Sequence, residues 1–401
     1  MKRSGRDTHL AALALRVKEL AASGEHQRRR KLWADAVNLR TTRPVVNFYM
    51  YEDVWARELS AKGIRSADPF AREIETQLAF KLWRAGHVHD DCPVEPLVRV
   101  LAARPPRTAP MWGVEMTVER TDESGSYKEL PPIRRPEDLQ NLRAPRYEID
   151  RAETARVVEK AQALTGGALP VAVRTDELHW GPFEYAVRLR GIESILFDVY
   201  DAPGFLHRLM GTITDCIISY QDEREAAGGV AADASSFGHV PYDEVPSDLR
   251  TRLKGMWAYI HAQSAASLSP QMYAEFIHPY NCRLASLAGK TYYHGCEDLS
   301  KKCRIIKTLP GLRLFHISPW TPAAPVISEL GNSVAYEVHS HPTNVLFGGS
   351  RDEIRSELKR LKAAARGTSH VLALADVETF GGRFDRIAWW ADAARDVASS
   401  S

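Results

Sequence analysis

A regular alternation of strand-like and helix-like segments constrains this chain to an α/β fold with parallel strands. Five short runs rich in β-branched and aromatic residues recur in the second half, with helical patterns between them: 256–261, 290–294, 312–317, 334–338 and 370–375. Because the connections are short, neighbouring strands must run parallel and join through right-handed helical crossovers.

Helix signals agree with this alternation. Ser269 before Pro270 predicts a helix start, and Gly289 lies just past the predicted end of the same helix. Ser350 and Glu353 have the spacing of a capping box at the start of a later helix. An amphipathic pattern near the N-terminus predicts a further helix there.

The first half of the chain adds three strand candidates, at 44–50, 97–102 and 170–174. Three and five make eight, which predicts a (β/α)8 TIM barrel closed into a ring. A doubly wound open sheet is the alternative, but no Gly-x-Gly-x-x-Gly turn follows any of these strands.

The expected organisation is a single barrel domain over residues 1–401 with an N-terminal helical extension and two insertions. Helices are expected in 1–43 and the barrel in 44–397. The insertions are 104–147, with a hairpin around 111–119, and the long loop 226–250. Long loops in compact domains are commonly functional.

Charge and cysteine usage exclude several classes of protein. The chain carries 53 Lys and Arg against 51 Asp and Glu, a formal net charge of +2. This balance gives no reason to expect nucleic acid as a partner, and no apolar run is long enough to span a membrane. Five cysteines without a Cys-x-x-Cys pair predict reduced thiols and a cytoplasmic setting.

The sharpest chemical signal is His294-Gly295-Cys296, at the end of the strand at 290–294. Residues i and i+2 of a strand project to the same side, so His294 and Cys296 should face one point at the barrel mouth. Imidazole and thiolate are ligands that Zn²⁺ prefers. The alternative is a buried histidine beside a small apolar cysteine.

Residues 268–280 read Leu-Ser-Pro-Gln-Met-Tyr-Ala-Glu-Phe-Ile-His-Pro-Tyr. This segment resembles the Ser-Pro-x-Met-Tyr-x-Glu-Phe-x-x-Pro-Tyr helix of the uroporphyrinogen decarboxylase superfamily. The likeness extends over about residues 30–397 and is strongest from 170 on, with similar segments at 181–184, 310–312 and 316–320. It implies a (β/α)8 barrel, the same fold as the strand count.

His294 and Cys296 stand where the zinc-dependent, corrinoid-linked methyltransferases of this superfamily carry a His-x-Cys pair. Those proteins generally have a second Cys after the last strand, whereas residues 375–380 here read Ala-Asp-Val-Glu-Thr-Phe. Asp376 is therefore the expected third zinc ligand, with Glu378 as the fallback. The other interpretation is a site that has lost its metal, in which Asp376 is a plain acid or acceptor.

The leading hypothesis is a methyltransferase that moves a methyl group between a small O-, N- or S-methyl substrate and a corrinoid protein, with zinc as Lewis acid. A metal-free decarboxylase or lyase acting on an aromatic or pyrrolic acid is the runner-up. The stretch 43–51 lacks the arginine pair that would hold a porphyrinogen. A non-catalytic tetrapyrrole- or corrinoid-binding protein is the third hypothesis. The oligomeric state stays open, with a homodimer as one assembly.

Other strand ends supply weaker candidates. His261, Asp176 and Glu177, with His179 beside them, are candidate acid–base groups. For His316 the sequence favours a histidine satisfied by the backbone over a ligand, and for His339 and His341 a metal or substrate role stays open. Tyr292, Tyr293 and Trp320 are the candidate residues for binding the corrinoid cofactor.

Overall fold

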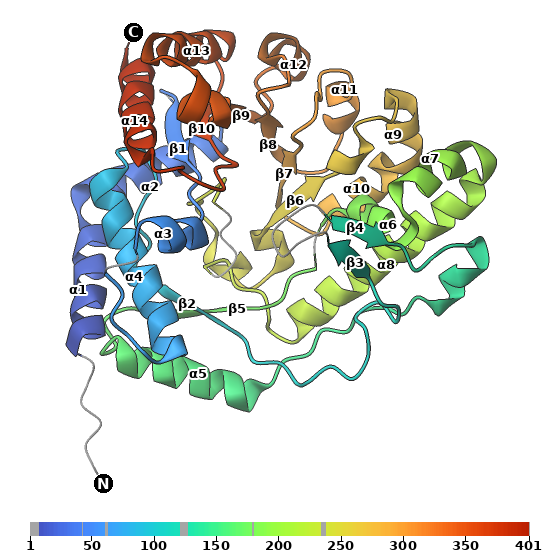
Figure 1. Ribbon diagram of the computed structural model, residues 1–401, viewed down its shortest axis with the longest axis horizontal. Coiled ribbons are helices and arrows are strands. Elements are labelled where there is room, and N and C mark those ends of the chain that lie inside the picture. Colours follow the sequence, from blue (N-terminus) through green and yellow to red (C-terminus); the bar gives the residue numbers. More distant parts are fainter. Residues whose placement is uncertain are drawn as a thin grey trace.

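The structure is a computed structural model, shown in Figure 1, and it describes residues 8–41, 43–60, 63–120, 127–178, 180–233 and 238–400. All eight expected strands are present, with bounds within two residues of the expected ones. They are β1 (Val45–Phe48), β2 (Val98–Leu101), β5 (Val171–Arg174), β6 (Trp257–His261), β7 (Lys290–His294), β8 (Leu312–Ile317), β9 (Ala335–His339) and β10 (His370–Leu374).

Six of these strands form one parallel sheet in the order β1-β10-β9-β8-β7-β6. The first and last strands of the chain are therefore neighbours, as barrel closure requires. Strands β2 and β5 pair with each other in a separate parallel ladder. Hydrogen-bonded pairing within the described residues does not join β1 to β2 or β5 to β6. The fold is thus a TIM-barrel-like α/β arrangement, and the ladder is not the continuous ring that the sequence predicted.

Side chains explain the break beside β1. The backbone N–H groups of Val46 and Phe48 donate to the carboxylates of Asp91 and Asp90, at 2.8 and 2.9 Å. The Arg84 guanidinium donates to the carbonyl of Phe48 at 2.8 Å. These buried side chains form hydrogen bonds with the backbone groups on the unpaired edge of β1, so the strand needs no partner strand there.

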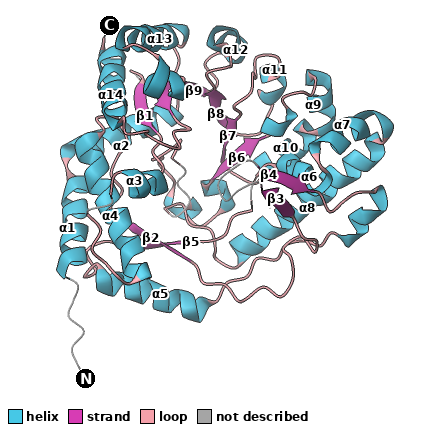
Figure 2. Ribbon diagram, in the orientation of Figure 1, coloured by secondary structure: helices cyan, strands magenta, loops and turns pink. Residues whose placement is uncertain are grey.

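Helices lie on the outer side of the six-stranded sheet and of the β2–β5 pair (Figure 2). They are α1 (Thr8–Ala22), α2 (Gly24–Val37), α3 (Glu52–Glu58), α4 (Pro69–His87), α5 (Arg151–Leu164), α6 (Pro182–Arg190), α7 (Ile192–Asp201), α8 (Pro203–Ala226), α9 (Pro270–Phe276), α10 (His278–Ala285), α11 (Cys303–Ile306), α12 (Ala323–Leu330), α13 (Arg351–Ala364) and α14 (Phe384–Ser399). Short helical turns are η1 (Pro136–Asn141), η2 (Ser247–Leu249), η3 (Leu253–Gly255), η4 (Gln263–Ala265) and η5 (Asn344–Gly348). Within the described ranges, no helix combines the length and the apolar character needed to cross a bilayer.

Two local predictions need correction. The helix expected to run from Pro270 to Gly289 breaks at Ile277, because Pro279 lacks an N–H and instead lies in the first turn of α10. The hairpin expected around 111–119 lies later, at β3 (Thr117–Arg120) and β4 (Tyr127–Leu130). Trp112 packs fully buried against Tyr185 in the main core, so its segment is not available for strand pairing. The capping predictions are confirmed, since Ser269 and Ser350 accept from the amides of Met272 and Glu353.

An apolar layer fills the barrel below the mouth. Val45, Leu314, Ala335, Val371 and Ala373 pack together from five inward-facing strand positions. Buried residues of α2, including Trp33, belong to the same cluster and cover the end where the strands begin. The polar site described below therefore has an apolar layer beneath it, on the side where the strands begin.

His26 on α2 gives a test of the fold that does not involve the site. Its ring is 2% exposed, and Nδ1 accepts from the amide of Val94 at 3.1 Å. Burial, reinforced by Arg29, lowers the pKa of His26 to about 4. Below pH ~6.5 the unfolded chain gains a proton that the folded protein does not. The free energy of unfolding should therefore fall by about 2–3 kcal/mol between pH 6.5 and pH 4.

His26→Asn keeps an acceptor and should remove this part of the acid dependence, as measured by urea unfolding at pH 7 and pH 4. The exposed His89→Asn is the matched control and should behave like the parent protein. An unchanged acid dependence in His26→Asn would show that His26 does not carry it.

Candidate metal centre

Strand β7 places the predicted histidine–cysteine pair at the barrel mouth. His294 is the last residue of β7 and is buried, and Cys296 follows it, half-buried, after the Gly295 turn. The ligand atoms of His294, Cys296 and His316 all lie within 4.8 Å of one another. The two side chains therefore converge, as the i, i+2 spacing predicts.

His316 completes this group and corrects the sequence prediction. It is the fifth residue of β8 and only 1% exposed, and its Nδ1 lies 2.9 Å from the hydroxyl of Tyr292 and 3.2 Å from Glu337 Oε2. Side chains, not the backbone, thus hold this ring. Its Nε2 atom has no hydrogen-bond partner in the described part of the chain. A buried imidazole nitrogen that has no hydrogen-bond partner and lies next to a histidine and a thiol is typical of a metal-ligating histidine.

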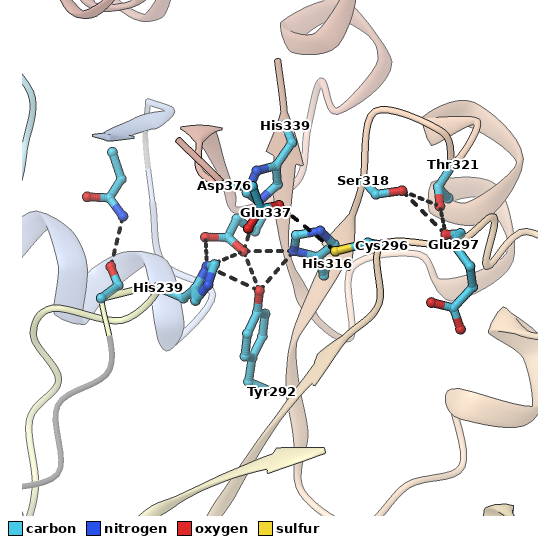
Figure 3. Close-up of polar contacts among 12 residues, drawn as sticks. His239, Tyr292, Cys296, Glu297, His316, Ser318, Thr321, Glu337, His339 and Asp376 are labelled. Atoms are coloured by element: carbon cyan, nitrogen blue, oxygen red, sulfur yellow. Dashed lines mark hydrogen bonds and ion pairs between the residues drawn. The ribbon is translucent and has the colours of Figure 1, made fainter. Parts of the chain in front are cut away.

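Glu337, which belongs to none of the sequence motifs, lies at the centre of the polar network. It is the third residue of β9, 1% exposed, and its carboxylate accepts from the hydroxyl of Tyr292 and from the rings of His239 and His316 (Figure 3). A charged residue inside the otherwise apolar run 334–338 was the available signal, because a buried carboxylate is retained only with partners.

His239 comes from the 226–250 insertion, and its Nδ1 lies 2.9 and 3.0 Å from the two oxygens of Glu337. Two contacts fix the loop: the Asn47 amide donates to the carbonyl of Gly238 at 3.0 Å, and Gly238 packs against Tyr49. A Cβ on Gly238 would lie 1.6 Å from the Tyr49 ring, so only glycine fits. No sequence pattern pointed to His239, because the contact spans elements far apart in the chain.

His339, the last residue of β9, joins the same group, and its Nε2 lies 3.1 Å from Glu337 Oε2. The ligand atoms of His239, His316, Glu337 and His339 are mutually within 4.8 Å, and all four residues are buried. His341, two residues further, is half-buried and packs its ring against Trp320 at 5.5 Å. The structure therefore brings His339 and not His341 into the cluster.

The protonation states of the clustered side chains favour a bound cation. Burial lowers the pKa of His294 well below its usual value and that of His316 to about 3, so both rings are neutral and offer a lone pair. Burial, Asp376 and Glu297 raise the pKa of the Cys296 thiol to about 12. Burial alone would raise the pKa of Glu337, but His239 and His339 outweigh it and hold that pKa well below the usual value. Negative groups around a thiol oppose a thiolate unless a cation is bound.

The residues present fit a zinc ion. Two neutral imidazoles and a cysteine supply the nitrogen and sulfur ligands that Zn²⁺ prefers, and one lone pair lacks a partner. Asp376, the predicted third ligand, lies beside the group with its Oδ2 3.9 Å from Cys296 Sγ. It follows β10 in a left-handed conformation, with φ of 58°. His316, not Asp376, is thus the third member of the compact group, and Asp376 is available as a fourth.

The predicted acid–base residues have different surroundings. His261 ends β6 in register with His294, half-buried, and its ring lies against Gly181. Asp176 forms ion pairs with Arg104 and Arg107, and Glu177 pairs with Arg224 at 2.6 Å. His261 is therefore next to the metal group, whereas the two carboxylates are engaged by arginines. His179 lies outside the described residues.

The three residues predicted to bind the cofactor also lie in different surroundings. Tyr292 is fully buried, and its hydroxyl is part of the Glu337 network. Tyr293 faces the other side of β7, where its hydroxyl accepts from Tyr273 at 3.0 Å and its ring stacks on Phe315. Strand alternation thus gives Tyr293 a packing position. Trp320 is 55% exposed at the mouth.

A solved structure of a methyltransferase from Methanosarcina mazei is similar to this chain. The TM-score is 0.55 with 14% sequence identity, and the match covers 92% of this chain and 98% of that one. No family model matches the sequence, and no curated protein matches it either. At this identity the likeness establishes a shared fold over nearly the whole chain.

Proposed function

We propose that this protein is a methyltransferase that moves a methyl group between a small O-, N- or S-methyl substrate and a corrinoid protein, with a zinc ion bound at the barrel mouth. The observation that carries the proposal is the convergence of His294, Cys296 and His316 within 4.8 Å at the ends of β7 and β8. The similar Methanosarcina mazei structure is itself a methyltransferase, which supports the same reaction class.

The residues of this chain would hold the ion in a defined way. Neutral His294 and His316 present lone pairs, and Cys296 supplies sulfur. Because Glu337 accepts from Nδ1 of His316, the proton is assigned to that nitrogen and Nε2 is left for the metal. The Tyr259 ring stacks on His294 with centroids 5.3 Å apart and fixes its orientation.

A zinc ion in this site supplies Lewis acidity toward the heteroatom that carries the methyl group. Burial raises the pKa of the Tyr51 and Tyr259 hydroxyls, and the carboxylate of Asp376 and the thiol of Cys296 raise both further. Trp320 is exposed just after the end of β8, where a flat corrinoid ring on a partner protein could stack. The five free cysteines support a reducing, cytoplasmic setting.

The test uses free corrinoids in place of the partner protein. Zinc-loaded protein is incubated with methylcobalamin and small thiols, or with cob(I)alamin and O-, N- or S-methyl compounds, and the cobalamin spectrum is followed. We expect zinc-dependent conversion in one of these directions, lost after chelation and restored by Zn²⁺. Carbon dioxide release from an aromatic or pyrrolic acid by metal-free protein would instead support a decarboxylase. Tight cobalamin binding without turnover would support a non-catalytic binding protein.

A further inference from the structure

We propose that His239, Glu337 and His339 bind a second divalent transition-metal ion, directly beside the zinc position. The proposal goes beyond the methyltransferase function and rests on residues that this function does not require as ligands. Figure 3 shows His239 and His339 approaching the Glu337 carboxylate from different sides. They come from the 226–250 insertion and the end of β9, so the inserted loop completes the site.

Distances within this group suit a shared ion. His239 Nδ1 lies 2.9 and 3.0 Å from the two Glu337 oxygens, and His339 Nε2 lies 3.1 Å from Oε2. Ligand bonds of about 2.1 Å at angles of about 90–109° separate neighbouring ligand atoms by about 3.0–3.4 Å. Both histidine–Glu337 distances therefore already match neighbouring ligand atoms around one ion, and the ligand atoms of the two histidines lie within 4.8 Å of each other.

One buried nitrogen of this group lacks, among the described residues, a hydrogen bond that would explain its burial. His339 is 3% exposed, and its Nε2, although close to Glu337, makes no hydrogen bond to any described residue. A polar atom that is buried and unsatisfied costs about 1–3 kcal/mol. A metal ion would use this lone pair and would balance the charge of the buried Glu337 carboxylate.

The donor set indicates the class of ion. Two imidazoles and a carboxylate suit Zn²⁺, Co²⁺, Ni²⁺ or Fe²⁺, whereas Mg²⁺ and Ca²⁺ prefer oxygen ligands alone. His316 lies between the two positions, with Nδ1 toward Glu337 and Nε2 without a hydrogen-bond partner in the described residues. The second position contains no sulfur, and this difference makes the two sites spectroscopically distinct.

Cobalt(II) titration of chelator-stripped protein tests the proposal. Cobalt bound by Cys296 gives a thiolate-to-metal charge-transfer band in the near ultraviolet, whereas cobalt bound by His239, Glu337 and His339 gives only weak ligand-field bands. We expect two equivalents per chain, measured by elemental analysis. The double variant His239→Ala/His339→Ala should retain one equivalent with the band, and Cys296→Ser one equivalent without it.

The single variant His239→Gln keeps a polar partner for Glu337 and covers the case in which the double variant does not fold. Its affinity for the second cobalt ion should fall about 100-fold. His87→Ala/His89→Ala, at two exposed positions, is the control and should bind two equivalents. If the parent protein binds one equivalent of cobalt and the charge-transfer band is unchanged in His239→Gln, the second site is overturned and the proposed function is unaffected. Binding lost in His239→Gln but retained in Cys296→Ser supports the second site and contradicts the zinc position.

Discussion

Cys296→Ala is expected to reduce zinc affinity more than about 100-fold and to bring methyl transfer to background, because it removes the only sulfur ligand of the proposed site. The fold should be retained, since the half-buried Cys296 side chain lies after the end of β7. The free energy of unfolding of the metal-free protein should change by less than about 0.5 kcal/mol. Chelator competition measures the affinity, and urea unfolding measures the stability.

Cys282→Ala is the matched control. Cys282 is also a half-buried free thiol, but it lies on α10, where its Sγ is 3.3 Å from Nε2 of His278. This variant should bind zinc and turn over like the parent protein. Full zinc content together with full turnover in Cys296→Ala would contradict both the metal site and the mechanism.

Glu337→Gln is expected to give the largest loss of stability. The amide has one acceptor oxygen in place of two. Its NH₂ group would face His239 at the Oε1 position, or Tyr292, His316 and His239 at the Oε2 position. Leaving one or two of these buried donors without an acceptor should lower the free energy of unfolding by about 2–4 kcal/mol in metal-free protein. Zinc affinity should fall about 10- to 100-fold, because His316 loses the partner that orients it.

Glu329→Gln serves as the control for this substitution. Glu329 is exposed enough that its ion pair with Arg304 lies in solvent, so its loss should change stability by less than about 0.5 kcal/mol. Urea unfolding in the presence of chelator separates the stability effect from metal binding. A Glu337→Gln protein as stable as the parent would show that the carboxylate network is not a structural element of the barrel.

The two predictions differ in what they probe. Cys296 lies at the open end of the site and contributes to metal binding, whereas Glu337 lies beneath it and holds several donors at once. A variant of the first kind should be folded and inactive, and a variant of the second kind should be both less stable and weaker in metal binding.

Local sequence patterns predict the strands and the pair at the end of β7. Local patterns of β-branched residues, with Ser269 and Ser350 as helix caps, depend on neighbours in the chain, and all eight strands appear where these patterns place them. The i, i+2 spacing likewise brought His294 and Cys296 to one face. No local pattern predicts the break beside β1, because it depends on buried contacts of Asp90 and Asp91 with strand amides more than forty residues away.

The rest of the site depends on how distant elements pack together. His316, Glu337 and His339 belong to different strands, and His239 belongs to an inserted loop. Their meeting depends on strand order and on the close fit of Gly238 against Tyr49, neither of which leaves a local pattern. For the same reason Asp376 was expected as the third ligand, while the neighbouring strand supplied His316. Spacing along one strand fixes which side chains share a face, but packing between strands fixes which faces meet.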